Sequence, residues 1–256
     1  MSNIKEIYKY KLADINCADI LFCLFVTLFF FIISGCQDDK IQVSIPPVVL
    51  DVDAHEVVFG SSLALQGHAG YLGQETLKGA VCYLNHVNEQ GGVHGRHIRL
   101  ITRDDSYDPP KCLANTQRFI IEDQVFGLFC YVGTPTTLKI LPLVEEAQIP
   151  LLGMFTGANA LREPFLPYVI NVRASYYQET SAAVNHLVQE LRLAKIAVFY
   201  QYDAFGFDGL TGTEIALKQF NLEPVARGSY VRGTHDIGEG LERIIESDAQ
   251  AVVIIG

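Results

Sequence analysis

A threonine-rich turn at 131–137 is the strongest candidate in the sequence for a site that binds a small ligand. Thr134 suits the N-cap of a helix, Pro135 suits the first helical position, and Thr136 and Thr137 then fall in the first turn. Main-chain N–H groups, the positive end of the helix dipole and three hydroxyls would converge there, which favours a bound carboxylate. The same residues are equally typical of a turn that only caps a helix, so both interpretations stand.

Three further loops follow predicted strands and could form the wall of a pocket. Residues 64–73 contain Tyr71 and three glycines spaced three apart, which match neither GxGxxG nor a phosphate-binding GxxxxGK[ST] loop. Residues 155–159 include Phe155, Thr156 and Gly157, although a glycine-containing loop is more often only a turn. Residues 200–206 supply aromatic side chains and one carboxylate, which could close over a small ligand or pack at a helix start.

Catalytic and metal-binding motifs are lacking in the sequence. The seven histidines are scattered, and neither a GxSxG elbow nor an HExxH pair occurs. His94 and His97 are close in sequence, but such a loop pair is more often solvated surface than a metal site. The six cysteines form no CxxC pair, and the net charge of -10 offers no basic field for nucleic acid. We therefore expect no enzyme activity, no metal, no cofactor and no nucleic-acid partner.

The first 36 residues carry features of a secretory address. Residues 20–33 are apolar apart from Thr27 and follow three lysines, a pattern typical of a signal peptide and too short to span a bilayer comfortably. The next residues, Ser34-Gly35-Cys36 after Ile33, resemble a bacterial lipobox. We expect a lipoprotein signal peptide at 1–35, lipid on Cys36 and an extended tether at 36–55, which would anchor a domain outside the inner membrane. A retained anchor helix is the alternative.

The rest of the chain alternates short β-branched or aromatic runs with amphipathic segments. Strands are predicted at 57–63, 98–103, 124–130, 150–154, 168–172, 195–200, 223–226 and 251–255. Helices are predicted at 74–89, 109–122, 136–147, 178–191, 209–220 and 237–247. This order indicates βαβ units and mostly parallel sheets. Ligands bind such sheets at the carboxyl ends of the strands, where the loops described above lie.

Several of these segments together resemble one family. Residues 91–98 (GGVHGRHI), 104–109, 132–137, 148–152 and 205–209 are similar, in order and spacing, to elements of type I periplasmic binding proteins. The similarity is to the branched-chain amino acid and amide binding components of ABC transporters, and it extends over 56–256. It implies an α/β fold of two Rossmann-like lobes, here 56–173 and 174–256. Because relatives run on further, the second lobe is expected to be incomplete.

The resemblance also implies ligand contacts. Thr136, with Thr134 and Thr137 beside it, matches the turn that holds the ligand carboxylate in such proteins, and Phe155, Thr156 and Gly157 match the next turn. Tyr71 matches a tyrosine that lines the cleft, and Phe205 stands where relatives often have tyrosine. In the segment 171–179, Arg173 and Tyr176 would face the cleft. Arg173 could pair with an anionic group through two parallel N–H bonds, and it is equally suited to a salt bridge that stabilises the hinge. Asp104-Asp105, which could bind a divalent cation in other folds, becomes an ordinary turn.

The cysteines allow one disulfide. Cys112 lies in the predicted helix between two neighbouring strands and Cys130 at a strand end, so the two could be bonded in the oxidising periplasm, as in this region of related proteins. Cys82 would then be a buried free thiol.

The expected function is that of a non-catalytic lipoprotein on the periplasmic side of the membrane. It would capture an amino acid or similar small carboxylate by hinge closure between its lobes and present it to an ABC permease. A receptor that signals to a membrane kinase or cyclase is the alternative from another class, and a shortened remnant that no longer binds is a third possibility.

Overall fold

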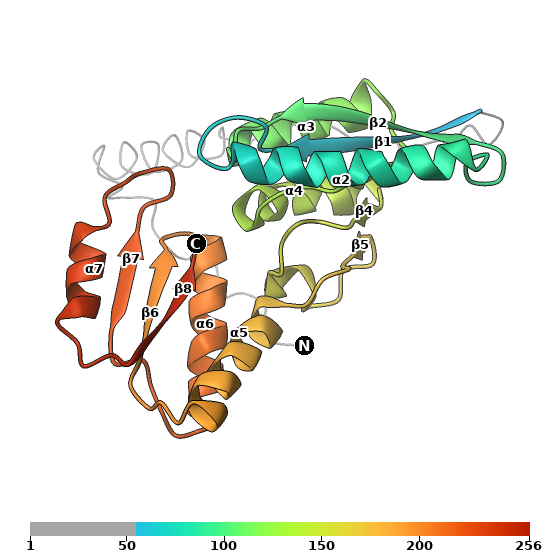
Figure 1. Cartoon of the computed structure of the whole chain (residues 1–256). Helices are drawn as coiled ribbons and strands as arrows, with labels where there is room; N and C mark the ends of the chain where they lie inside the picture. The colour runs from blue at the N-terminus through green and yellow to red at the C-terminus, as the bar shows by residue number, and fades with distance from the viewer. Residues whose placement is uncertain (1–54) are drawn as a thin grey trace, which may run out of the picture. The chain divides into compact units, whose positions relative to one another are not determined.

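The computed structural model describes residues 55–256, and they form α/β units with parallel sheets, as predicted (Figure 1). The signal peptide, Cys36 and all of the tether except His55 lie outside the described residues. None of the helices in the described part has both the length and the apolar composition needed to cross a bilayer.

The first unit is a five-stranded sheet in the order β2-β1-β3-β4-β5. Its strands are β1 Glu56–Leu63, β2 His97–Asp104, β3 Gly127–Phe129, β4 Leu151–Leu152 and β5 Val169–Ile170. Its helices are α2 Gly70–Glu89, α3 Pro109–Ile121 and α4 Thr134–Ala147, and a short 3-10 turn occupies Asn159–Leu161. All neighbouring strands are parallel, so their carboxyl ends meet at one edge.

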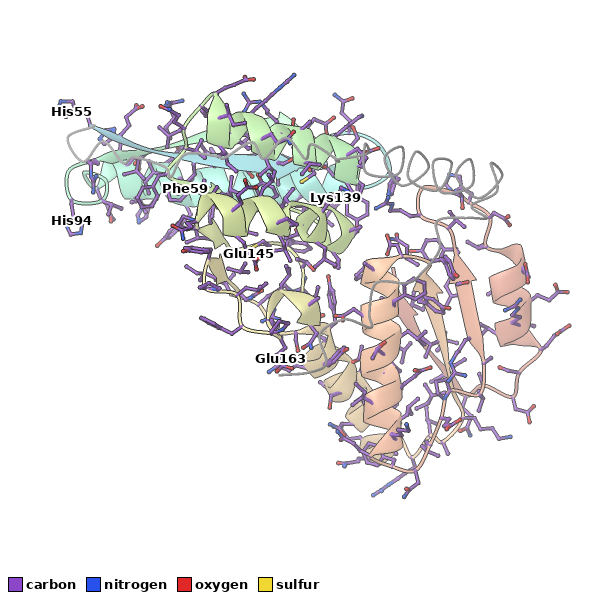
Figure 2. The ribbon with its side chains drawn as sticks, turned by 180° about the vertical axis from the view of Figure 1, so that it is seen from behind. His55, Phe59, His94, Lys139, Glu145 and Glu163 are labelled. Carbon is purple, nitrogen blue, oxygen red and sulfur yellow. The ribbon has the colours of Figure 1, made fainter. Side chains whose placement is uncertain are left out.

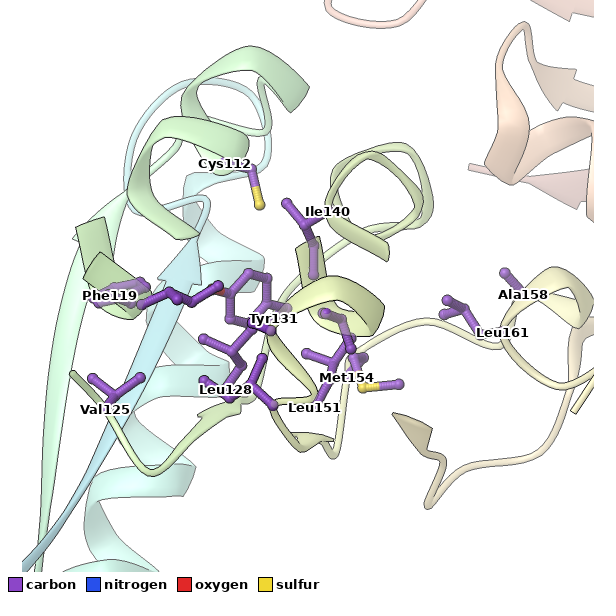
Figure 3. Close-up of a cluster of buried hydrophobic side chains, with 14 of the residues drawn as sticks. Cys112, Phe119, Val125, Leu128, Tyr131, Ile140, Leu151, Met154, Ala158 and Leu161 are labelled. Atoms are coloured by element: carbon purple, nitrogen blue, oxygen red, sulfur yellow. The ribbon is translucent and has the colours of Figure 1, made fainter. Parts of the chain in front are cut away.

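The core of the first unit lies where α3 and α4 pack against the strands. Phe119 from α3, Leu128 from β3, Ile140 from α4 and Leu151 from β4 are all fully buried in it (Figure 3). Tyr131 follows β3 and is buried among them, where its hydroxyl lies 2.9 Å from Thr116 Oγ1. Burial of these apolar side chains stabilises the unit whose strand ends carry the loops.

The second unit is a three-stranded parallel sheet in the order β7-β6-β8. It comprises α5 Tyr176–Asn185, a π-helical turn His186–Glu190, β6 Ile196–Gln201, α6 Ala204–Lys218, β7 Arg227–Tyr230, α7 Gly238–Ile245 and β8 Ala251–Ile255. A capping box starts α5: Ser175 Oγ accepts from the Gln178 main-chain N–H, and the Gln178 side chain accepts from Ser175 N–H. The boundary expected between residues 173 and 174 falls between β5 and α5.

Several predicted boundaries were wrong for identifiable reasons. The strand expected at 223–226 lies instead at Arg227–Tyr230, because Pro224 removes a main-chain donor from the predicted segment. Helix α6 begins directly after β6 rather than at residue 209, because Asp203 accepts from the N–H groups of Phe205 and Gly206 and caps it there. The helix expected at 178–191 starts earlier, at Tyr176, and ends in the π-helical turn.

Candidate ligand-binding site

A cavity of about 750 Å³ lies at the carboxyl ends of the strands and takes its wall from both sheet units. Four residues of the expected site line it: Tyr71, Phe155, Tyr176 and Phe205. The rings of Tyr176 and Phe205, one before β6 and one after it, meet edge to face with centroids 5.2 Å apart. The wall therefore carries several aromatic rings, which suit a ligand with an apolar body.

The threonine turn lies behind this wall rather than on it. The N-cap of α4 is Gly133, with φ at 100°, so Thr134 is already inside the helix and is not the N-cap as predicted. Thr136 Oγ1 donates to the carbonyls of Val132 and Gly133, at 2.6 and 2.9 Å, and Thr137 Oγ1 donates to Gly133 at 2.6 Å. Each hydroxyl has one proton, so in this arrangement neither has one left for a carboxylate.

Thr156 completes the polar layer beneath the wall. Its Oγ1 accepts from the Ala158 main-chain N–H at 3.2 Å and from the Tyr176 hydroxyl at 3.3 Å, and lies 2.7 Å from Thr134 Oγ1. Gly157 lets the chain pass closely, since an added Cβ would lie 2.8 Å from the Ala174 carbonyl oxygen. The expected residues Thr134, Thr136, Thr137, Thr156 and Gly157 thus shape the wall without lining the cavity.

Tyr107 lines the cavity and was not singled out from the sequence. It follows β2, and both Ser106 and Tyr107 have left-handed backbones, with φ of 50° and 62°. The carboxylate of Asp104 accepts from Ser106 N–H and that of Asp105 accepts from Tyr107 N–H, which holds this strained turn. Burial raises the pKa of Tyr107, so its hydroxyl keeps its proton at neutral pH.

Asp105 is the buried anchor of that turn. It accepts from Ser62 Oγ at 2.7 Å, and Asn115 Nδ2 donates to the same Ser62 oxygen at 3.1 Å. Burial raises the pKa of Asp105 despite these hydrogen bonds. This pair of aspartates therefore builds a turn, as expected, rather than a cation site.

The expected disulfide is absent from the structure. Cys112 and Cys130 are both free thiols. Cys112 is fully buried beside Ser62, Asp105 and Thr116, and burial raises its pKa. The Cys112 thiol thus lies in a polar cluster with Ser62 and Asp105. Cys82, which was expected to be buried, is exposed on α2.

Polar groups of the second unit approach the cavity from β6 and β7. Gln201 and Tyr230, at the ends of these strands, both line it. Gln201 Nε2 donates to Asp203 Oδ2 at 2.6 Å, and Arg232 Nη1 lies 3.7 Å from the same oxygen. The Arg232 guanidinium also lies 5.2 Å from the ring centre of Tyr107, so residues of the two units meet directly here.

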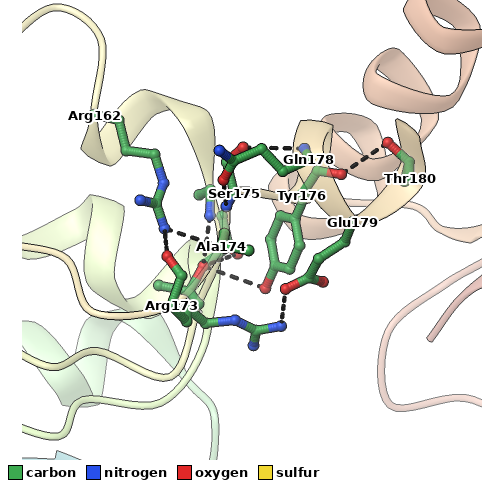
Figure 4. Close-up of polar contacts among 11 residues, drawn as sticks. Arg162, Arg173, Ala174, Ser175, Tyr176, Gln178, Glu179 and Thr180 are labelled. Atoms are coloured by element: carbon green, nitrogen blue, oxygen red, sulfur yellow. Dashed lines mark hydrogen bonds and ion pairs between the residues drawn. The ribbon is translucent and has the colours of Figure 1, made fainter. Parts of the chain in front are cut away.

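Arg173 and Glu179 form an ion pair in the cavity wall (Figure 4). The Arg173 guanidinium lies 5.2 Å from the ring centre of Phe155 and 5.5 Å from that of Tyr176. Behind it, Arg162 Nη2 donates to the carbonyls of Arg173 and Ala174, at 2.9 and 3.3 Å. The Arg173–Glu179 ion pair is therefore separate from the hydrogen bonds by which Arg162 holds the main chain.

Metal binding finds no support in the described part of the chain. Within residues 55–256, no group of three or more His, Cys, Asp or Glu side chains is placed to hold an ion. His94 projects, with His55, from the end of the first unit where β1 and β2 begin, which is opposite to the cavity (Figure 2). The alternative of a metal-binding His94 and His97 is not favoured by this placement.

Comparison with known protein families identifies the family to which this chain belongs. Residues 56–256, which is most of the chain, match the family model described as "Periplasmic binding protein". The chain belongs to this family. It is a family of binding proteins and not of enzymes.

Several members of the periplasmic binding protein family are similar to this chain. A possible leucine/isoleucine/valine-binding protein from Rhodopirellula baltica is 32% identical with a TM-score of 0.76, covering 81% of this chain and 57% of that one. A substrate-binding periplasmic protein from Ralstonia solanacearum is 31% identical with a TM-score of 0.74, covering 78% and 57%. An amino acid binding protein from Pseudomonas aeruginosa is 22% identical, covering 78% of this chain and 54% of that protein. The chain spans about half the length of the curated relatives it matches.

In this member of the family, the cavity-lining residues that were not predicted from the sequence share one feature. Tyr107, Gln201 and Tyr230 all lie at or just after the carboxyl end of a parallel strand. The rule that such ends form the site would have selected Tyr107 and Gln201. Tyr230 was missed because the strand that it ends, β7, was predicted at 223–226.

Proposed function

We propose that this chain captures an amino acid or a related small carboxylate outside the inner membrane, for delivery to an ABC permease. The observation that carries the proposal is the cavity of about 750 Å³ whose aromatic wall is shared by the two sheet units. A ligand there would touch both units at once, so it would favour the arrangement in which they are closed together. The relatives named as amino acid or Leu/Ile/Val binding support the ligand class.

Contacts between the units support closure as the binding step. The Asn159 main-chain N–H of the first unit donates to Asp208 Oδ2 of α6 at 2.9 Å, and the Tyr176 hydroxyl of the second unit donates to Thr156 Oγ1 of the first at 3.3 Å. These contacts lie beside the chain segment that joins the sheets. We propose that they guide the hinge while the ligand completes the closed state.

Calorimetric titration and thermal melting of the full chain in detergent, with the common amino acids and small carboxylates, test the ligand proposal. A ligand that binds only the folded state raises stability by about 2.7 kcal/mol at a hundredfold excess over Kd, so true binding shifts the melting temperature with concentration. A cooperative melt that no amino acid or carboxylate shifts would contradict the proposal.

Helix α2 offers a matched pair of variants for this test. Tyr71 lines the cavity and is 79% exposed, whereas Tyr83 on the same helix is 68% exposed and does not line it. Tyr71→Ala should weaken binding of the ligand found above, while Tyr83→Ala should not. Equal effects of the two changes would place the ligand elsewhere.

We also propose that Cys36 carries lipid, because the lipobox-like sequence before it follows an apolar run. Cells that express the chain should incorporate radioactive palmitate into it, and Cys36→Ser should abolish the labelling. Cys82→Ser, which changes an exposed cysteine of α2, is the control and should leave labelling intact.

A further inference from the structure

The Arg173–Glu179 pair brings opposite charges together in the wall of the cavity, beside aromatic rings. The side chains are 31% and 38% exposed, so both remain accessible from the cavity side. The contact with Glu179 is the one side-chain hydrogen bond of this guanidinium among residues 55–256. Arginine has five N–H donors, so most of its donors stay free for another partner.

We propose that this pair opens to receive the charged group of an α-amino acid, with the ligand carboxylate on Arg173 and its ammonium on Glu179. The inference rests on the proposed function and names the residues that select the ligand. The neighbouring rings of Phe155 and Tyr176 would hold the guanidinium plane in place and offer apolar surface to the amino acid side chain.

Charge balance favours a zwitterion over a simple anion or cation. A carboxylate alone would take Arg173 and leave Glu179 without its partner beside a second negative charge. An amine alone would leave Arg173 unpaired in the same way. A zwitterion gives each side chain a new partner, so no charge is left uncompensated in the partly desolvated cavity.

The main chain does not depend on the pair, so the pair can open at low cost. Arg162 holds the carbonyls of Arg173 and Ala174, and the capping box of Ser175 and Gln178 fixes the start of α5. Both sets of contacts remain when the Arg173 and Glu179 side chains separate. An ion pair that only stabilised the hinge would be needed to hold the main chain. Here other contacts hold the main chain, so the two side chains are available to bind a ligand.

Three isosteric probes test the proposal: L-leucine, 4-methylpentanoate, which lacks the ammonium, and 3-methylbutylamine, which lacks the carboxylate. Calorimetric titration of the full chain in detergent should show L-leucine binding more than about tenfold tighter than either, because each of the other probes leaves one of the two charged side chains without a new partner. Glu179→Gln should abolish the preference for L-leucine over 4-methylpentanoate. Arg173→Gln should abolish its preference over 3-methylbutylamine.

Arg227 and Glu214 supply the matched controls. They form an ion pair of similar exposure, 43% and 37%, outside the cavity wall. Glu214→Gln and Arg227→Gln should therefore leave all three affinities as in the unaltered chain. Arg173→Lys keeps the charge without the planar fork and should lie between the unaltered chain and Arg173→Gln, which preserves the test if Arg173→Gln does not fold.

Three results would overturn the proposal. If Glu179→Gln keeps the full preference for L-leucine, the pair is structural and the proposed function stands without it. If Glu179→Gln binds 4-methylpentanoate more tightly and the unaltered chain prefers this probe, the site takes anions and Glu179 only competes for Arg173. If the unaltered chain melts cooperatively and binds none of the probes, the amino acid function itself fails at the same time.

Discussion

Thr134 and Thr156, which follow neighbouring strands β3 and β4, hold their hydroxyl oxygens 2.7 Å apart. Both are fully buried or nearly so, and neither lines the cavity. Thr156 already accepts two hydrogen bonds, so it donates its own proton to Thr134. The threonine-rich turns thus form a layer that supports the aromatic wall.

Removing the hydroxyl of Thr136 tests whether that layer contacts the ligand. In Thr136→Val, two main-chain carbonyls lose a donor, which should lower the free energy of unfolding by about 1 kcal/mol. Because the hydroxyl does not face the cavity, the Kd for L-leucine should stay within about threefold of the original. Titration and urea unfolding measure the two effects. A folded variant that no longer binds would show that Thr136 turns its proton to the ligand carboxylate on binding.

A methyl group on Gly133 should displace Tyr107 from the cavity. An added Cβ at this position would lie 2.0 Å from Cε2 of the tyrosine, and the backbone φ of +100° is itself unfavourable for alanine. We expect Gly133→Ala to lose about 1 to 3 kcal/mol of stability from the backbone alone and to weaken L-leucine binding through the moved ring. Urea unfolding and titration report the two changes.

Gly91 is the matched control for the backbone part of that effect. Its φ is +95°, and an added Cβ would meet nothing within 4 Å. Gly91→Ala should therefore lose a similar increment of stability and leave binding unchanged. If Gly133→Ala behaves in the same way, the position of Tyr107 does not matter for binding.

The buried carboxyl of Asp105 should make stability fall as the pH rises. Its pKa is raised from the usual 3.8, because burial disfavours the charged form. The folded state therefore holds the proton where the unfolded chain has lost it, so the free energy of unfolding falls between the unfolded and folded pKa values. Well below about pH 4 the carboxyl is protonated in both the folded and the unfolded state, so its ionisation does not affect the free energy of unfolding.

Asp105→Asn isolates this contribution. The amide can still accept from the Tyr107 N–H, so the turn is kept, but it does not titrate. As the pH rises above about 4, the unaltered chain should lose stability relative to Asp105→Asn, as measured by urea unfolding at each pH. Parallel curves for the two proteins would show that Asp105 titrates alike in the folded and unfolded chains.

The contact of Asp208 with the Asn159 main chain should contribute more stability than an exposed ion pair does. Asp208→Ala removes a charged acceptor from that N–H, and we expect a loss of about 1.5 to 3 kcal/mol. Asp248 pairs with Lys195 at 3.0 Å with its side chain 85% exposed, so Asp248→Ala should cost less than about 1 kcal/mol. Equal losses in thermal or urea unfolding would mean that the link between α6 and the Asn159 turn is not formed in solution.

The fold was predictable from sequence because each element had a local cause. Alternation of apolar runs with amphipathic segments placed β1, β2, β6 and β8 within about two residues, and Pro109 marked the start of α3. Two residues of the aromatic wall, Tyr71 and Phe205, were expected there because each follows a predicted strand closely, although both lie in the first turn of a helix. Arg173 and Tyr176 were expected in the cleft from the family resemblance rather than from periodicity.

The rest depended on contacts between distant residues. Which way the Thr136 hydroxyl points is set by the carbonyls of the turn before it, and no spacing rule reveals that. Tyr107 enters the cavity because Asp104 and Asp105 hold a left-handed turn, anchored by Ser62 from another strand. The disulfide prediction was wrong because it considered only the positions of the elements, whereas the Cys112 thiol lies beside Ser62, Asp105 and Thr116.

Each described sheet is drawn from its own stretch of chain, the first from residues 56–170 and the second from 196–255. No described strand of one is interleaved with the strands of the other. During synthesis at roughly 5 to 20 residues per second, the first sheet leaves the ribosome seconds before the second is complete. The first unit can thus close its own core, including the turn that carries Tyr107, before the opposite wall of the cavity exists.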